Sequence, residues 1–365
     1  MAEDAAVADV MTNAGAGALP PLGKNAVLRR DDPALWAKTW ENLVYQPTSH
    51  AAGMLDYQHA YFSGAGWQIE DASLILLNDG QPCGLIPLMI RIGDAVSITS
   101  SGQPIFQPVF TRNTMPGTVK KVGAWLLDLL VETHRNLGLG TMVCEGVPEM
   151  SAPYGLNEWH RQQMTLGAVG SVLHDVYTET SLTLEEIRAS IRKSFRPLVS
   201  MGQKLWKAEV IDQSSITEAL WEEFRQLHIA VAGRVTRSLE SWQAQLRMIE
   251  AGEAFYVQLR EPSDDRLVGG GLFQTTRDEC VYAIGAYDRN LFDKPLGHLV
   301  QYMAILRAME MKLKWHKIGY RPFAGDHTKP SPKEISIGEF KQGFSTHIFP
   351  RFVFTHDLKS EGQHG

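Results

Sequence analysis

The chain has 365 residues, which is longer than one typical domain, so we expect two domains. Its formal net charge of −6 argues against broad binding of nucleic acid, because that function needs a basic surface that neutralises phosphates. Although 44% of the residues are hydrophobic, no uninterrupted apolar run has transmembrane length, and we expect a soluble protein.

Residues 1–25 are expected to form a disordered tail. The stretch from Met1 to Gly23 is rich in Ala and Gly and has no Lys or Arg, so it lacks the basic start of a secretory signal. The three cysteines, Cys83, Cys144 and Cys280, are far apart and lie in or beside apolar segments. This pattern favours reduced thiols and a cytoplasmic location, and disfavours a disulfide framework or a nucleophilic cysteine. The histidine spacing matches no metal site.

The first half alternates helical and strand patterns and carries no charged constellation of its own, which favours a structural role. We expect the Pro-containing loop from Ser100 to Pro108 to form a wall of an inter-domain cleft. Thr48 or Ser49 is expected to cap the second helix. The predicted elements are helices Ala34–Leu43 and Ala51–Phe62, strands Ala72–Leu77, Cys83–Ile92 and Ala95–Thr99, helix Thr118–Leu137 and strand Thr141–Glu145.

A basic segment over residues 178–208 is predicted to be a linker and helix. Arg188, Arg192 and Arg196 are spaced four apart, so a helix would place them on one face, before Pro197 bends or ends it. Such a face is a candidate phosphate clamp. The alternative is an ordinary solvated helix face.

The second half opens with a strand, two helices and a turn rich in hydrogen-bond donors. The turn from Gly233 to Trp242 contains Arg234, Thr236 and Arg237, a composition that suits an anionic ligand. The alternative is a loop in which Arg237 pairs with Glu240 and Trp242 packs in the core. The predicted elements are strand Glu209–Ile211, helix Ile216–Ala230, a helix that ends at Met248, and strands Ala254–Leu259 and Leu267–Thr275.

A βαβ unit follows, with strands Cys280–Tyr287 and Trp315–Tyr320. Asp293 is placed to cap the intervening helix, whose start offers unpaired amides that suit a phosphate, although most such units bind nothing there. The preceding strand contains Gly269, Gly270 and Gly271. Glycine inside a strand indicates either a close approach to the backbone or a simple bulge.

The C-terminal block carries a recognisable pattern, in which Phe340-Lys341 precedes Gly343-Phe344. This pattern resembles the closing motif of the FemAB-like branch of the GNAT acyltransferase superfamily. The resemblance implies an α+β fold with tandem GNAT-like domains, over residues 26–177 and 209–360, in which mixed sheets are flanked by helices. It also implies an active cleft between the domains, with the acyl donor on the second.

The family transfers an acyl or aminoacyl group to an amine. By its pattern, Phe340 and Lys341 match the Phe-Lys pair at the reaction centre, where Lys341 would hold phosphate or stabilise the tetrahedral intermediate; the alternative is a surface lysine. The glycine-bearing strand would splay from its neighbour and offer main-chain groups to the pantetheine arm of CoA. The residues expected to contact this co-substrate are Gly269, Gly270, Gly271, Lys294, Gly297, His298 and Phe340.

Two departures from the family pattern matter. The usual Gly-rich phosphate loop is replaced by Lys294-Pro295-Leu296-Gly297-His298, and the tyrosine that normally protonates the leaving thiolate would fall near Glu339. The identity of the general base is therefore not determined by the motif, and the candidates are Glu240, Asp326, His298 and His327.

The donor is expected to be an acyl-CoA, used as a co-substrate, with no permanently bound cofactor. Binding of tRNA is not expected, since the chain lacks a charged helical insertion, and neither is binding of DNA. The resemblance favours a nucleotide-linked amino sugar of surface-polysaccharide synthesis as the acceptor, with Arg234, Thr236, Arg237, Arg192 and Arg196 as its ligands. The alternatives are an aminoacyl-tRNA-dependent transferase that acts on peptidoglycan precursors and a non-catalytic module that binds nucleotide sugars.

Overall fold

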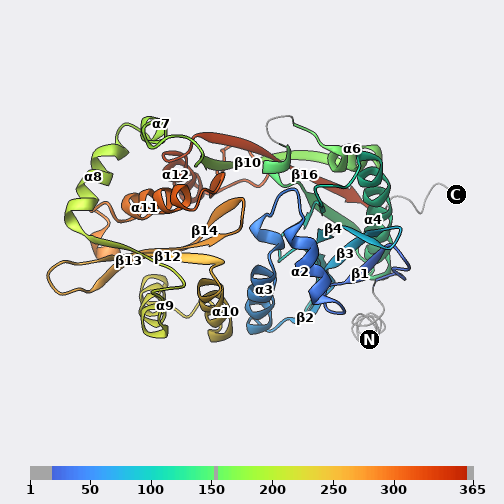
Figure 1. The fold of residues 1–365 in the computed structure, drawn as a ribbon, viewed down its shortest axis with the longest axis horizontal. Helices are drawn as coiled ribbons and strands as arrows, with labels where there is room; N and C mark the ends of the chain where they lie inside the picture. Colours follow the sequence, from blue (N-terminus) through green and yellow to red (C-terminus); the bar gives the residue numbers. More distant parts are fainter. Residues whose placement is uncertain (1–18, 152–154, 360–365) are drawn as a thin grey trace. The chain divides into compact units, whose positions relative to one another are not determined.

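The computed structural model describes residues 19–151 and 155–359, so most of the tail expected over residues 1–25 lies outside the described residues. The chain divides into two compact units. Unit 1 comprises residues 1–172 and 351–365, and unit 2 comprises residues 173–350. The chain passes between the units within β10 (Val169–Glu179) and again within β16 (His347–Asp357) (Figure 1).

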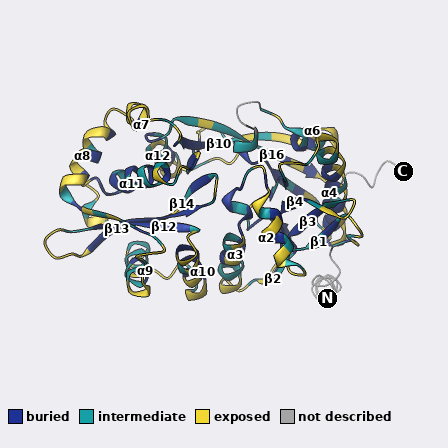
Figure 2. Cartoon of the chain, viewed as in Figure 1, coloured by how far each residue is buried: buried dark blue, intermediate teal, exposed yellow. Residues whose placement is uncertain are grey.

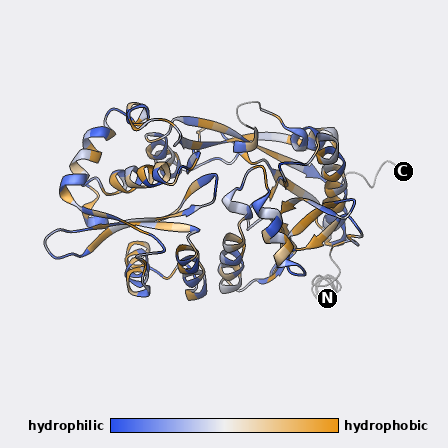
Figure 3. Ribbon diagram, viewed as in Figure 1, coloured by the Kyte–Doolittle hydropathy of each residue, from blue (hydrophilic) through white to orange (hydrophobic). Residues whose placement is uncertain are grey.

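Unit 1 is built on sheets that pack against a long helix, α4 (Pro116–Asn136). Leu126, Leu127 and Leu130 of α4 are fully buried in one cluster with strand residues such as Leu74 and Leu76. Hydrophobic colours follow these strands in Figure 3. The sheets are β1-β3-β4-β8 and β2-β5-β6, together with β9, which pairs antiparallel with β16 and parallel with β7.

In the rest of unit 1, β9 has the predicted bounds and α2, α3, β3 and β6 overlap predicted elements, whereas β1, β2, β7, β8, α5 and α6 were not predicted. The elements are β1 (Ala26–Leu28), α2 (Pro33–Glu41), α3 (Ala52–Gly64), β2 (Gln68–Asp71), β3 (Leu74–Asn78), β4 (Gln81–Ile86), β5 (Met89–Ile92), β6 (Val96–Thr99), β7 (Ile105–Phe106), β8 (Val109–Phe110), β9 (Thr141–Glu145), α5 (Pro148–Ser151) and α6 (Glu158–Thr165).

Two local predictions for unit 1 are wrong. The single strand predicted over Cys83–Ile92 is two strands, because Pro87 cannot donate to a ladder, and β4 and β5 join different sheets. The predicted cap at Thr48 or Ser49 is absent from the start of α3. Those residues form a short 3₁₀ turn, and Ala51 precedes α3 without a side-chain cap.

Unit 2 has its strands in the order β11-β12-β13-β14-β15-β10. Neighbouring strands pair antiparallel, apart from β14 and β15, which are parallel and joined by a helix, as the βαβ prediction requires. The elements are α7 (Leu184–Ser190), α8 (Phe195–Leu205), β11 (Lys207–Ile211), α9 (Glu218–Ala232), α10 (Leu239–Glu250), β12 (Ala254–Arg260), β13 (Leu267–Thr275), β14 (Glu279–Tyr287), α11 (Leu296–Glu310), β15 (Trp315–Tyr320) and α12 (Pro332–Gln342).

Helices cover both faces of this sheet (Figure 1). On one face, Leu299, Val300 and Ala304 of α11 pack on strand residues such as Phe255. On the other face, Trp221 and Phe224 of α9 pack against Tyr256, with 4.7 Å between the ring centroids of Phe224 and Tyr256. All nine residues of β13 are consequently buried, and the strand reads as a nearly continuous apolar run (Figure 2).

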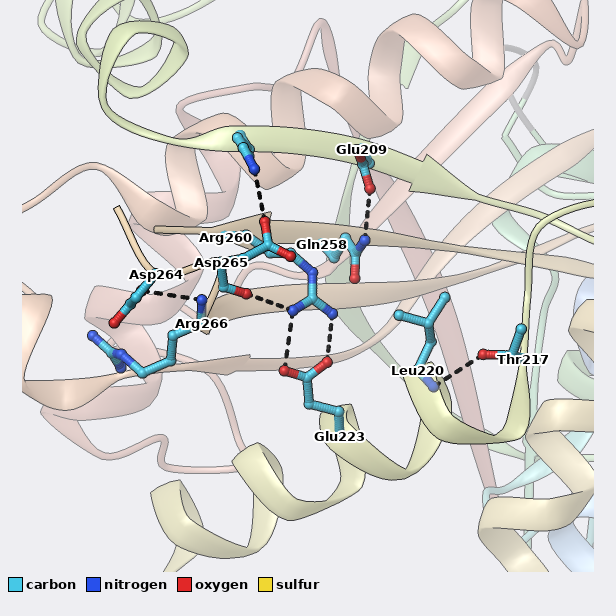
Figure 4. Close-up of polar contacts among 10 residues, drawn as sticks. Glu209, Thr217, Leu220, Glu223, Gln258, Arg260, Asp264, Asp265 and Arg266 are labelled. Atoms are coloured by element: carbon cyan, nitrogen blue, oxygen red, sulfur yellow. Dashed lines mark hydrogen bonds and ion pairs between the residues drawn. The ribbon is translucent and has the colours of Figure 1, made fainter. Parts of the chain in front are cut away.

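An ion pair links α9 to β12, and a side-chain hydrogen bond links β11 to the same strand (Figure 4). Arg260 of β12 makes a two-pronged hydrogen bond to the carboxylate of Glu223 on α9, one prong of 3.1 Å. Gln258, two residues earlier on the same strand, donates to Glu209 of β11 at 2.8 Å. A guanidinium that meets a carboxylate with two parallel bonds fixes orientation as well as distance.

The segment expected as a linker over residues 178–208 belongs to unit 2. Ile187 of α7 and Phe195 of α8 are buried in one cluster with Ile318 and Phe344. The boundaries expected at residues 26–177 and 209–360 also differ at the C-terminus, because residues 353–357 of β16 pair with β9 in unit 1. Hydrophobic packing and strand pairing extend past the points where the composition changes.

Candidate active site

The strands β14 and β15 of unit 2 part from each other after a short parallel contact. Their pairing runs from Glu279 to Val281 on β14 and from Trp315 to Lys317 on β15. Beyond it, β14 continues to Tyr287 paired with β13, and β15 continues to Tyr320 paired with β10. The facing backbone edges then have no strand partner in each other, so they can offer amides and carbonyls to a ligand. We call this place the β14–β15 split.

The splay was expected at the glycine-bearing strand, and this expectation is wrong. Gly269, Gly270 and Gly271 pair with β12 on one side and β14 on the other. Their role is in packing: a Cβ on Gly270 would lie 2.5 Å from the ring of Tyr256, and one on Gly269 would lie 2.9 Å from the ring of Tyr287. The neighbouring rings therefore lie flat on the sheet only because these positions lack side chains.

The helix α11 begins at Leu296, close to the end of β14. Asp293 is not its cap, since Pro295 occupies that position without a side-chain hydrogen bond. A Cβ on Gly297 would lie 3.2 Å from the ring of Phe340 and 3.7 Å from that of Tyr287. The first turn of α11 therefore leaves amides that no capping side chain satisfies, beside the rings of Phe340 and Tyr287, while Lys294 is exposed just before it.

Four aromatic rings form the wall behind this helix start. His298 of α11 meets Phe195 at 4.6 Å and Phe340 at 5.1 Å, both edge to face, and Phe344 packs against the same group. Burial lowers the pKa of His298 to about 4, so the imidazole is neutral at pH 7. A Cβ on Gly343 would overlap the ring of Phe195, which explains the glycine of the Gly-Phe corner.

Lys341, at the end of α12, lies across β15 near the split. Its Nζ is 2.6 Å from the position that a Cβ on Gly319 would occupy. Gly319 has φ +135°, a conformation that other residues rarely adopt, and the β10–β15 register shifts beside it, between Val176 and Tyr177. Burial lowers the pKa of Lys341, and the nearby charge of Asp175 opposes that change. The side chain of Lys341 is half-buried.

Sequence reasoning missed the buried ion pair between Asp175 on β10 and Lys317 on β15. Asp175 on β10 is 2% exposed, and Nζ of Lys317 on β15 is 3.3 Å from its carboxylate. The ammonium of Lys317 also lies 5.5 Å above the ring of Tyr177. A carboxylate inside an apolar strand was the available signal, since Asp is depleted in strands and almost never fully buried without a charged partner.

The proposed bases differ sharply in their surroundings. Asp326 accepts hydrogen bonds from the hydroxyl of Tyr320 at 2.8 Å and from the amide of Phe323 at 2.9 Å. Burial acts to raise the pKa of Asp326, but the Phe323 amide and the Tyr320 hydroxyl outweigh it and lower the pKa below its usual value. Such a carboxylate holds a turn and is a weak base. His327 and Glu240 are exposed.

The three arginines expected on one helical face are not on one helix. Because α7 ends at Ser190 and α8 begins at Phe195, Arg192 lies between them. It donates to the carbonyl of Glu339 at 3.0 Å, and Arg196 donates to the carbonyl of Ile191 at 3.0 Å. These side chains bind backbone carbonyls and do not lie together on one helix face, as the predicted phosphate clamp requires. Pro197 opens α8 rather than ending a helix, as the fixed φ of proline allows in a first turn.

The donor-rich turn has a different organisation. The guanidinium of Arg237 lies 5.1 Å above the ring of Trp242, and Nη1 is 3.5 Å from Oε1 of Gln245. Trp242 packs in the core, as one of the two interpretations predicts. Ser238 caps α10, and Arg234 and Thr236 are exposed.

Two classes of site are missing from the described part of the chain. Over residues 19–151 and 155–359, no group of three or more His, Cys, Asp or Glu side chains could hold a metal ion. Within the same residues, no helix combines the length and the apolar character that crossing a membrane requires.

No protein-family model and no curated protein matches the sequence. Among solved structures, FemX matches over 91% of this chain and 96% of its own, with a TM-score of 0.62 and 12% identity. A tandem GNAT protein from the clavulanic acid biosynthesis pathway matches over 92% of this chain and 98% of its own, with a TM-score of 0.50 and 10% identity. The protein has a FemX-like tandem GNAT fold. L-PGS from Bacillus licheniformis is also similar, with a TM-score of 0.59 at 11% identity, covering 94% of this chain and 96% of its own. The FemX-like fold confirms the predicted α+β class. At these low sequence identities, the similarity to the solved structures shows the fold alone.

Proposed function

We propose that the protein is an N-acyltransferase that moves an acyl group from a carrier thioester to an amine. The observation that carries this proposal is the position of Lys341, whose ammonium lies over Gly319 where β14 and β15 part. The start of α11, with its uncapped amides, lies in the same unit beside Phe340. A cation, strand edges and a helix start together suit a polarised carbonyl on an anionic carrier.

The reaction requires four changes of bonding. The amine nitrogen attacks the carbonyl carbon, and the carbonyl electron pair becomes an oxyanion that the ammonium of Lys341 stabilises. The oxyanion then re-forms the carbonyl as the bond between carbon and the carrier sulfur breaks, and the sulfur leaves as a thiolate that takes up a proton. The nitrogen loses one proton to a base. Among the candidate bases, His298 is neutral at pH 7 but its pKa of about 4 makes it a weak base, and Asp326 is held in a turn by hydrogen bonds.

The carrier is proposed to be CoA. Its phosphates carry negative charge, which the first turn of α11 and the exposed Lys294 can attract, while Gly297 and Phe340 shape the neighbouring wall. The net charge of −6 gives no general attraction for tRNA. An aminoacyl-tRNA donor remains the second candidate, because the Phe340-Lys341 corner is the part that resembles the FemAB-like branch.

The acceptor is proposed to be an amino sugar linked to a nucleotide. Arg237, stacked on Trp242, presents a planar cation of the type that binds phosphate, and Arg234 and Thr236 are exposed on the same turn. This part of the proposal rests on the resemblance and on that single stacked guanidinium. If nucleotide sugars raise the melting temperature but no donor is consumed, the binding-module alternative is favoured.

The proposal is tested with the purified full chain. A panel of acyl-CoAs is mixed with amino sugars and nucleotide-linked amino sugars, and release of free CoA thiol is measured together with the mass of the acylated product. Charged tRNA replaces acyl-CoA in a parallel arm. Thiol release that depends on the acceptor supports the proposal. Product formation only with charged tRNA would show that the donor is an aminoacyl-tRNA and not an acyl-CoA. Absence of product in both arms overturns the enzymatic assignment.

A further inference from the structure

We propose that unit 1 carries a binding site for an aliphatic amine in its protonated form. The site is a cavity of about 710 Å³ that lies between α4, the turn after α6 and the end of β16. All of its lining residues belong to unit 1, so the inference is independent of the transferase chemistry proposed for unit 2.

The polar wall of the cavity is acidic. Asp128 and Glu132 are four residues apart on α4 and therefore lie on one helix face, and Asp357 of β16 lines the same cavity. Within the described part of the chain, no ion pair or side-chain hydrogen bond engages Asp128 or Glu132. Among the lining residues, three carboxylates face one guanidinium, that of Arg135, so the wall keeps a net negative charge.

His356 supplies a further hydrogen-bond acceptor. It is 5% exposed, and its ring lines the cavity. Nε2 contacts Oε1 of Gln163, and because an amide oxygen only accepts, Nε2 carries the hydrogen. Burial lowers the pKa of His356, so the imidazole is neutral at pH 7 and Nδ1 has a lone pair. Nδ1 is accessible, and among the described residues it has no hydrogen-bond partner.

A metal ion does not fit this arrangement of acceptors. Over residues 19–151 and 155–359, no three His, Cys, Asp or Glu side chains are placed to share one. The acceptors of the cavity are therefore spread along its wall, and they alternate with the aliphatic side chains of Val131, Leu166, Val169 and Leu358. A ligand that combines a charged end with an aliphatic body matches such a wall, and the volume is within the range of about 300–1,000 Å³ for small-molecule sites.

The charge of the wall selects the sign of the ligand. An ammonium group donates up to three hydrogen bonds and accepts none, which matches carboxylates and an imidazole lone pair. A ligand with a carboxylate or a phosphate would face like charges from Asp128 and Glu132. The expected ligand is therefore an alkylammonium ion whose chain lies against the aliphatic side chains.

The sign preference is tested with two probes that share one apolar chain. Hexylamine and hexanoate are each titrated into the purified full chain at pH 7, where an aliphatic amine is protonated, and binding is followed by saturation-transfer NMR. Saturable binding of hexylamine at millimolar concentration, without saturable binding of hexanoate, supports the proposal. Equal binding of both probes, or no saturable binding of hexylamine, overturns it.

The acidic wall is tested with exposed residues, so that the fold is retained. Asp128→Asn combined with Glu132→Gln should weaken hexylamine binding roughly fivefold or more, as expected for the loss of two partly exposed charge pairs. Leu166→Lys adds a cation to the wall and should also weaken binding. Asp94→Asn is the matched control, because Asp94 is an exposed carboxylate of the same unit that does not line the cavity. Equal affinities in the double variant and the wild type would refute the site.

A spectroscopic readout locates the amine without relying on affinity. The histidines of the full chain are labelled with ¹³C and ¹⁵N, and the signals of His356 and His50 are assigned with His356→Gln and His50→Gln. Hexylamine should shift the His356 signal and leave that of His50, a buried histidine of the same unit, unchanged. Binding without a shift at His356 would place the amine elsewhere and overturn the assignment, while the transferase proposal would stand or fall by its own assay.

Discussion

The ammonium of Lys341 occupies the space that a side chain on Gly319 would need, with 2.6 Å between Nζ and the Cβ position. A glycine at this point of β15 therefore allows a lysine from α12 to cross the strand. The position of the proposed reacting cation depends on a residue in another element.

Gly319→Ala should displace Lys341 and strain the backbone. The φ of +135° is one that alanine rarely adopts, and such strain costs about 1–3 kcal/mol. We expect a lower free energy of unfolding in urea and a loss of transferase activity greater than the loss of folded protein at the assay temperature. Gly117→Ala is the control, since a Cβ there meets open space in α4 and should leave stability unchanged or improved. Wild-type activity in Gly319→Ala would contradict the role assigned to this crossing.

Lys341→Met should abolish most activity while the fold is retained. Loss of a group that stabilises a developing oxyanion typically costs about 10²–10³ in kcat. Methionine keeps the apolar length of the side chain, so the melting temperature should change little. Lys333→Met is the matched control because Lys333 is an exposed lysine on the same helix. Undiminished thiol release in Lys341→Met would remove the basis of the proposed mechanism.

Gly270→Ala should destabilise unit 2 by overpacking. The added methyl group would lie 2.5 Å from the ring of Tyr256, a residue held between α9 and the sheet. Overpacking of this kind costs about 1–3 kcal/mol. Chemical denaturation measures the change, and the double variant with Tyr256→Leu should recover part of it. Additive effects of the two substitutions would show that the ring does not require the glycine.

Stability should fall as pH falls from about 6.5 towards 4. Burial lowers the pKa of His316 to about 4 against an ordinary value of 6.5, so the unfolded chain binds a proton in this range that the folded chain does not. A shift of this size corresponds to roughly 3 kcal/mol once pH is below both values. Urea denaturation at pH 7 and pH 4.5 should show a smaller difference in His316→Gln than in the wild type.

Much of the fold follows from local patterns in the sequence. The predicted strands Thr141–Glu145 and Trp315–Tyr320 have the observed bounds, because apolar runs between turn residues mark strands well. Long-range packing is less accessible. The glycine triplet predicted a splay at β13, whereas the strands part at β14 and β15, since nothing local reveals that the rings of Tyr256 and Tyr287 cover these glycines.

The proposed site shows the same division. Phe340 and Lys341 could be singled out from a short motif, but nothing local in the sequence links Asp175 to Lys317, and only the pairing of β10 with β15 brings these two residues together. The three arginines do not share one helix face because the chain leaves the helix after Ser190. Arg196 binds the carbonyl of Ile191 at that break, and Arg192 binds the carbonyl of Glu339 on α12. Helical spacing predicts a shared face only while the helix continues.

The two crossings of the chain, in β10 and β16, have a consequence for biosynthesis. A ribosome delivers β9 early, but its antiparallel neighbour over residues 353–357 emerges only after the whole of unit 2. During translation, unit 1 thus lacks its last strand until unit 2 has been synthesised, and unit 2 can begin to fold first. A nascent chain stalled before residue 351 should leave that edge of β9 open to proteases or chaperones.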